Sequence, residues 1–108
     1  MKQPILDHLQ MHALGRQRAI KAQRLAEGFG LSIREINEVI HDLRESGLII
    51  GSSKIRPFGY YIPETDDERR DCIRTYESEA MDMMRILTRM KKSIKQHVNI
   101  GSQLEIQF

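Results

Sequence analysis

The segment from Thr65 to Ile100 contains neither proline nor glycine, and this feature limits most strongly what the chain can fold into. Thr65 is a good N-cap residue, and the acidic residues at 66–68 suit the first turn of a helix. The apolar residues that follow alternate at spacings of three and four, as in a coiled-coil seam: Ile73, Tyr76, Ala80, Met83, Leu87, Met90 and Ile94. The sequence therefore predicts a helix from Asp66 to about Gln96, roughly 46 Å long.

Such a helix is too long to bury its whole seam on the small domain that the rest of the chain can form. The chain has 108 residues, of which 40% are apolar, so we expect one domain over 1–64, the helix over 65–98 and a tail over 99–108. A large catalytic fold such as a TIM barrel, with about 250 residues, is excluded. Two arrangements stay open: the helix folds back on the first helix of the domain, or it pairs with a second chain.

The charge distribution along this helix favours one kind of pairing. Residues 64–82 include eight acidic residues and three arginines, whereas residues 85–95 include five basic residues and no acidic one. An antiparallel pair brings opposite charges together, Glu77, Glu79 and Asp82 with Arg85, Arg89 and Lys92. A parallel pair would place like charges side by side. We therefore predict a homodimer through this helix, and the alternative is a monomer whose helix packs on its own domain.

The first domain begins with two short helices. Pro4 suits a first helical turn, and apolar residues recur at helical spacing from there to Leu14, which precedes a glycine. A second, brief helix is predicted over Ala22 to Phe29, because its apolar residues share one face and glycines mark its end.

The strongest local signal is the capping box formed by Ser32 and Glu35, which fit the S-x-x-E pattern. It predicts a third helix that begins at Ile33 and ends at Ser46. The apolar residues of this segment follow the three-four rhythm of one buried stripe, and Gly47 is placed to end the helix. The opposite face is polar and free to meet solvent or a ligand.

Two short strands are expected next, over residues 48–50 and 59–62, joined by a loop that contains Gly, Ser and Pro and has a basic tip. Helix, helix, capped helix and two-stranded ribbon is the order of elements in a winged helix-turn-helix. The predicted fold class is mainly α: a winged helix-turn-helix, with three helices and a two-stranded β wing, followed by the long C-terminal helix.

The stretch from Leu31 to Ile50, followed by Gly59-Tyr60-Tyr61-Ile62-Pro63, resembles the DNA-binding domain of biotin-repressor-type bacterial winged-helix regulators. In that family a Leu-Arg-x-x-Gly motif ends the recognition helix, and a Gly-Tyr-x-Leu/Ile motif returns from the wing. The layout is also similar to that of small phage and prophage proteins. The resemblance implies that the protein binds double-stranded DNA as a transcriptional regulator or as an accessory in phage or bacterial DNA transactions.

In such a protein the helix over about 33–46 lies in the major groove, and its first two turns reach the base edges. The candidates for base contact are Ser32, Arg34, Asn37, Glu38 and His41. Arginine can bind guanine, and asparagine adenine, through two hydrogen bonds. The candidates for phosphate contact are the basic residues near the second helix, on the third helix and on the wing: Arg16, Arg18, Lys21, Arg24, Arg44, Lys54 and Arg56.

The third helix also carries several carboxylates, which a DNA duplex repels. This mixed charge leaves a second interpretation open, in which the protein is an interaction adaptor in a replication or transcription assembly. We expect no enzyme, because no spacing suggests a catalytic site. His8 and His12 stand four residues apart without an evident third ligand, so no metal site is predicted, and no cofactor or small-molecule ligand is expected.

Cys72 is the single cysteine, so no disulfide framework can form within the chain, and we expect it to be an inert packing residue. No apolar run is long enough to span a membrane, and the start of the chain lacks the layout of a signal peptide. We therefore expect a cytoplasmic protein that does not contact membranes. The segment from Gln103 to Phe108 alternates apolar and polar residues, which suits either an added strand or a frayed end.

Overall fold

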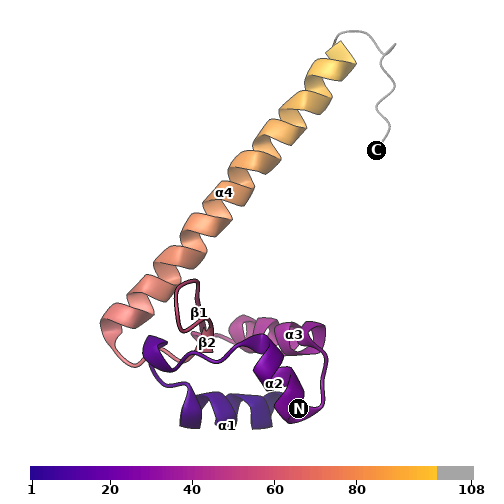
Figure 1. The fold of residues 1–108 in the computed structure, drawn as a ribbon. Coiled ribbons are helices and arrows are strands. Elements are labelled where there is room, and N and C mark those ends of the chain that lie inside the picture. Colours follow the sequence, from indigo (N-terminus) through magenta and orange to yellow (C-terminus); the bar gives the residue numbers. More distant parts are fainter. Residues whose placement is uncertain (100–108) are drawn as a thin grey trace. The chain divides into compact units, whose positions relative to one another are not determined.

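A computed structural model of the protein describes the backbone of residues 1–99 and side chains up to residue 95. It confirms the predicted fold class. The elements are α1 (Lys2–His12), a short 3₁₀ helix (Arg16–Arg18), α2 (Ala22–Phe29), α3 (Ile33–Glu45), the strands β1 (Gly51–Ser53) and β2 (Gly59–Tyr61), and the long helix α4 (Asp66–Asn99) (Figure 1). The chain divides into two compact units, the winged unit over residues 1–74 and a second unit from residue 75 onward.

The core of the winged unit is aliphatic and is shared by its three short helices. Its largest fully buried side chains are Ile5 and Leu9 of α1, Leu25 of α2, and Ile36 and Ile40 of α3. The named residues of α1 and of α3 stand four apart, and Leu25 is joined on α2 by Ala26 and by the partly buried Ala22 and Phe29. Each helix therefore presents one apolar stripe to the other two. The helices therefore enclose one core, and their remaining faces are available for contacts outside it.

The bounds of α1 differ from the predicted ones, because tertiary contacts end the helix early. The segment after His12 pairs with the end of the hairpin: the Gly15 amide donates to the Ile62 carbonyl at 2.7 Å, and the Ile62 amide donates to the Ala13 carbonyl at 2.8 Å. These backbone groups cannot also serve an extension of the helix. At its other end α1 begins at Lys2, so Pro4 lies inside the first turn, where a proline is tolerated.

The start of α3 agrees with the predicted capping box. The Ser32 hydroxyl accepts from the Glu35 amide at 3.1 Å, and the Glu35 carboxylate accepts from the Ser32 amide at 3.0 Å. The helix ends at Glu45, and Gly47 follows with a φ of +102°. The Leu48 amide donates to the Leu43 carbonyl at 3.2 Å, which closes the last turn.

The first strand of the wing begins at Gly51 instead of the predicted Leu48. Arg44 explains the shift, since its guanidinium donates from Nε and Nη2 to the Ile50 carbonyl, at 3.0 and 2.7 Å. The Ile50 carbonyl is therefore bound by a side chain. Pairing is antiparallel from Gly51 opposite Tyr61 to Ser53 opposite Gly59.

An extended segment at Ile20 adds a third, one-residue partner to the wing, which the sequence did not predict. The Ile20 amide donates to the Tyr60 carbonyl at 2.9 Å, and the Tyr60 amide donates to the Ile20 carbonyl at 2.8 Å. Gly59 makes this contact possible, because it has a φ of +128° and a Cβ atom there would lie 2.1 Å from the Ile20 oxygen. The start of α2 is thereby fixed beside the wing.

The first two turns of α4 belong to the winged unit, so this unit extends beyond the predicted boundary at residue 64. The Thr65 hydroxyl accepts from the Glu68 amide at 3.1 Å, as predicted for an N-cap. The Glu68 carboxylate accepts from the Arg16 amide at 3.1 Å, and the buried Tyr61 hydroxyl lies 3.3 Å from the Cys72 sulfur. Burial, with the hydrogen bond to Cys72, raises the pKa of Tyr61.

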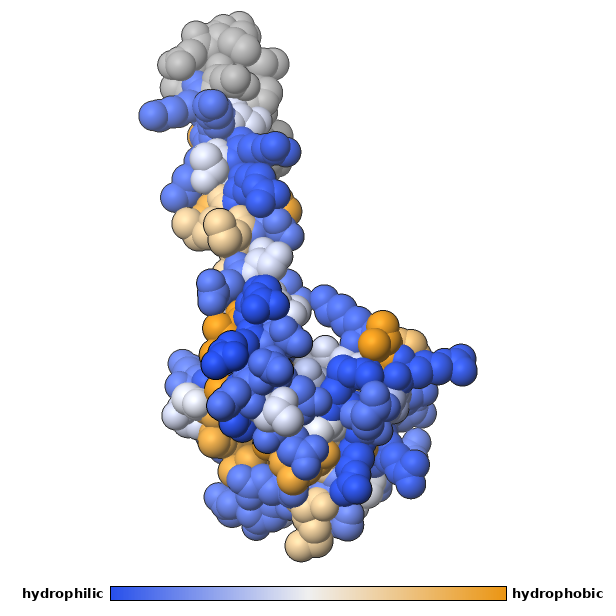
Figure 2. Space-filling view, turned by 90° about the vertical axis from the view of Figure 1, so that its left-hand side faces the viewer, coloured by the Kyte–Doolittle hydropathy of each residue, from blue (hydrophilic) through white to orange (hydrophobic). Residues whose placement is uncertain are grey.

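Beyond the winged unit α4 continues as an unbroken helix to Asn99, three residues past the predicted end. Apolar side chains stand exposed among charged ones along it (Figure 2). No helix within residues 1–99 combines the length and the apolar character that crossing a membrane requires. The predictions for the tail from residue 100 to Phe108 lie outside the described residues.

Candidate nucleic-acid interface

The outer face of α3 carries two ion pairs between residues four apart. Arg34 Nε lies 3.3 Å from a Glu38 oxygen, and His41 Nε2 lies 3.7 Å from a Glu45 oxygen. All four side chains are exposed. Arg34, Glu38 and His41 line, with Asn37, a shallow hollow along the helix. In this structure Arg34, the arginine of the predicted reading face, is thus paired with a carboxylate of the same helix.

Asn37 is held by the wing. The Tyr60 hydroxyl of β2 donates to Asn37 Oδ1 at 2.7 Å, which leaves the amide nitrogen of Asn37 as its outward donor. Partial burial raises the pKa of Tyr60, and the nearby Arg44 guanidinium, 5.6 Å from the ring centre, opposes this shift. The contact ties the predicted reading face of α3 to strand β2 of the wing.

Arg44, a predicted phosphate contact, faces the Ile50 carbonyl and the Tyr60 ring. Its guanidinium is therefore engaged in joining the end of α3 to the wing. Asp42, two residues earlier on α3, lies 3.4 Å from Lys2 at the start of α1. These contacts fix the end of α3 on both sides.

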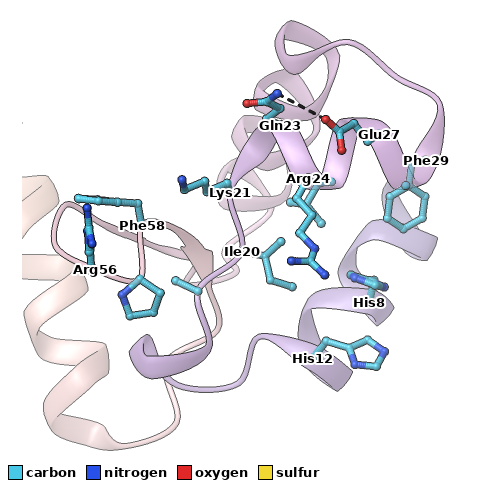
Figure 3. A pocket seen from close by; sticks show the side chains of 14 residues that line it. His8, His12, Ile20, Lys21, Gln23, Arg24, Glu27, Phe29, Arg56 and Phe58 are labelled. Atoms are coloured by element: carbon cyan, nitrogen blue, oxygen red, sulfur yellow. Dashed lines mark hydrogen bonds between the residues drawn. The ribbon is translucent and has the colours of Figure 1, made fainter.

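A second surface, between α1, α2 and the wing, carries an excess of positive charge. A concave region of about 1350 Å³ is lined by Lys21 at the N-cap of α2 and Arg24 within this helix, by Arg56 and Phe58 of the wing, and by residues of α1 (Figure 3). Lys21, Arg24 and Arg56 are exposed, and all three are among the predicted phosphate contacts. We call this region the basic hollow.

The basic hollow has one carboxylate among the described residues that line it, that of Glu27. Its oxygen accepts from the Gln23 amide of the same helix at 3.4 Å (Figure 3). The three cations therefore outnumber the acidic groups, and the local potential is positive. By contrast α3 carries four acidic residues and two arginines, of which Arg44 is bound to the wing.

The far wall of the basic hollow is formed by aromatic contacts between α1 and α2. The His8 ring lies edge-on to Phe29 with centroids 5.5 Å apart, and 4.7 Å from the ring of His12 (Figure 3). No group of three or more His, Cys, Asp or Glu residues within the described part of the chain is placed to hold a metal ion. Sequence spacing paired these histidines with each other, but it held no signal for the contact with Phe29.

The remaining predicted phosphate contacts lie outside the basic hollow. Arg16 Nη1 donates to the Arg56 carbonyl of the wing at 3.4 Å. Arg18 and Lys54 are exposed outside the basic hollow. The structure thus brings together three of the seven residues and separates them from the predicted base contacts. Phe58, exposed on the wing beside Arg56, is the site residue that the sequence did not single out.

The fold and these two surfaces define a winged-helix unit with a basic hollow and a charged third helix. No protein family model matches the chain, and neither a curated protein nor a solved structure matches it significantly. The function must therefore be argued from the surfaces themselves.

Proposed function

We propose that the winged unit binds double-stranded DNA and that Lys21, Arg24 and Arg56 contact its phosphates. The observation that carries the proposal is the convergence of these three exposed cations on one concave surface. Phosphate contacts position a protein on a duplex and provide most of its sequence-independent affinity. The pairing of Ile20 with Tyr60 holds the start of α2 beside strand β2 of the wing, so Lys21 is tied to the hairpin that carries Arg56.

Within this proposal α3 remains the candidate for sequence reading. Arg34, Glu38 and His41 stand exposed on its outer face, where they would reach base edges in a major groove. Arg34 would exchange its ion pair with Glu38 for a guanine, which offers two acceptors, and Glu38 would be free to accept from cytosine. Asn37 would contribute only its side-chain amide nitrogen, as a hydrogen-bond donor, because Tyr60 already binds its oxygen.

The charge of α3 favours a second candidate function, that of a protein-binding adaptor. Its outer face offers both positive and negative groups to a partner surface, which suits a polar protein interface better than a polyanion. The two candidates differ in one measurable property, since only DNA binding releases condensed counterions and weakens steeply with salt.

The test is a salt titration of binding to a random-sequence duplex, followed by fluorescence anisotropy. We compare the wild type with the triple variant Lys21→Ala/Arg24→Ala/Arg56→Ala. With three phosphate contacts, the logarithm of the binding constant should fall with the logarithm of the salt concentration with a slope of about −2.7. The triple variant should lose nearly all of this slope, because each neutralised phosphate contributes about one unit.

The matched control removes three arginines that form ion pairs within α4, in the variant Arg70→Ala/Arg74→Ala/Arg85→Ala. It changes the net charge equally and should keep most of the wild-type affinity and slope. Equal losses in both variants would refute the assignment to the basic hollow. A wild type that fails to bind at low salt would refute DNA binding and support the adaptor.

A further inference from the structure

The second unit presents an exposed apolar seam along α4. Exposure of its large side chains ranges from 42% for Leu87 to 71% for Met83. The seam lies on a helix of 34 residues, which is about 51 Å long. A continuous helix with exposed apolar groups at spacings of three and four is the geometry that a second helix covers in a coiled coil.

The apolar face of this helix is widest at its middle. Met84 and Ile86 flank the seam on its two sides, at 61% and 57% exposed, between the seam residues Met83 and Leu87. Arg85 lies at the centre of this group on the opposite side of the helix. Toward either end the flanking positions are polar or charged, for example Glu77 and Lys91. A face that narrows equally in both directions can match a copy of itself about a twofold axis at its centre.

The charges change sign at the same centre. Residues 77–82 include three acidic residues and no basic one, and residues 85–95 include five basic residues and no acidic one. When two copies lie antiparallel about this centre, the acidic half of each helix faces the basic half of the other. Glu77 then lies beside Lys91 of the other copy, at positions that flank the seam.

Side-chain sizes also favour antiparallel pairing. With the axis at Arg85, Leu87 packs against Met83 of the second copy, Met90 against Ala80, and Ile94 against Tyr76. Each pair combines a seam residue before the axis with one after it. A parallel pair would instead set Ala80 against itself and leave a gap in the seam, which close-packed interfaces avoid.

We propose that α4 forms an antiparallel homodimer whose twofold axis passes near Arg85. The partner is a second copy of this chain, and the interface extends from Tyr76 to Ile94. The exposed methionines in and beside the seam, at positions 83, 84 and 90, can adjust to the facing helix because methionine is flexible. This proposal does not depend on DNA binding.

The test uses full-length chains in which Cys72 is replaced by serine, so that each carries one introduced cysteine. One chain has Met83→Cys and the other, lengthened by a tag, has Leu87→Cys. After mixing and mild oxidation, the antiparallel dimer should give mainly the mixed disulfide, because these positions face each other across the axis. Two self-linked products without the mixed one would establish a parallel dimer and overturn the proposal.

A control chain with Ser78→Cys, at a position that faces away from the seam, should remain largely unlinked. Light scattering should give a dimer mass for the wild type at micromolar concentration and a monomer mass for Leu87→Asp. A monomer mass for the wild type would overturn the proposal, even if the protein binds DNA.

Glu77→Lys should weaken the dimer at low salt at least tenfold, and Glu77→Lys/Lys91→Glu should restore it. Lys92, which charge counting groups with the facing charges, lies on the side of the helix opposite the seam, so Lys92→Glu should dimerise like the wild type.

Discussion

Helices α3 and α4 begin with the same chemistry and use their apolar stripes differently. Each has a hydroxyl at its N-cap and a glutamate three residues into the helix, Ser32 with Glu35 and Thr65 with Glu68. In α3 the stripe is buried, with Ile36 and Ile40 at most 1% exposed, whereas beyond Arg74 the stripe of α4 is exposed. Local signals therefore decide where a helix starts, and the size of the domain decides how much of its stripe is covered.

This difference separates two roles within one short chain. The stripe of α3 stabilises the winged unit and so leaves only its polar face for a ligand. The apolar residues of α4 beyond Arg74 are not part of the described core of that unit. Their spacing is nevertheless as regular as that of a buried stripe. An exposed regular stripe is the kind of surface that the proposed antiparallel homodimer would cover.

The largest effect that separates the two stripes is expected from removing one large aliphatic side chain from each. Ile40→Ala should lower the free energy of unfolding of the winged unit by about 2–5 kcal/mol, because it leaves a cavity in a closed core. Leu87→Ala should leave that free energy unchanged. Urea unfolding followed by the NMR signals of β1 and β2 measures both. A loss of stability of the winged unit in Leu87→Ala as large as in Ile40→Ala would contradict the separation.

A smaller effect is expected from the two N-caps. Ser32→Ala and Thr65→Ala should each cost about 1 kcal/mol, since each leaves an amide of the first turn without its acceptor. Amide hydrogen exchange should place the two losses differently. Loss of the Ser32 cap should speed exchange throughout the winged unit, while loss of the Thr65 cap should speed it mainly in the first turns of α4. Serine-to-threonine and threonine-to-serine exchanges at these positions should be nearly neutral.

The sequence alone predicts the elements whose signals are local. The capping box at Ser32, the N-cap at Thr65 and the bounds of α2 follow from residue type and spacing, and the structure agrees with them. The position of β1 could not be predicted in this way, because it depends on Arg44 reaching the Ile50 carbonyl. The pairing of Ile20 with Tyr60 depends likewise on backbone groups 40 residues apart, and no periodicity encodes it.

The candidate interface was predictable in its members and unpredictable in its arrangement. Charge counting identified Lys21, Arg24 and Arg56 as cations for phosphate contact, but it grouped them equally with Arg44. In the structure the Arg44 guanidinium binds the Ile50 carbonyl, whereas the other three cations line the basic hollow. Likewise, spacing placed Asn37 on an outer face, whereas its bond to Tyr60 depends on where the wing returns.

The smallest effect concerns the pH dependence that the capping glutamates add. Hydrogen bonds from the backbone amide of Glu64, and then from that of Arg16, lower the pKa of Glu68, and those from Ser32 lower the pKa of Glu35. A carboxylate with a lowered pKa in the folded state binds its proton more readily when unfolded. Its stabilising effect is therefore complete above the ordinary glutamate pKa and is lost as the pH falls through the lowered value. Glu68→Gln should consequently be less stable than the wild type at pH 7, and this difference should narrow as the pH falls below the ordinary glutamate pKa. Because Glu35 is exposed and Glu68 is only partly buried, the differences should be smaller than those of the caps and should shrink in high salt. Glu68 also joins α4 to the segment at Arg16, so its substitution should have the larger effect of the two. Thermal unfolding between pH 7 and pH 3 measures the stability difference between Glu68→Gln and the wild type. A difference that is the same at both pH values would show that the glutamate acts through packing and not through its charge.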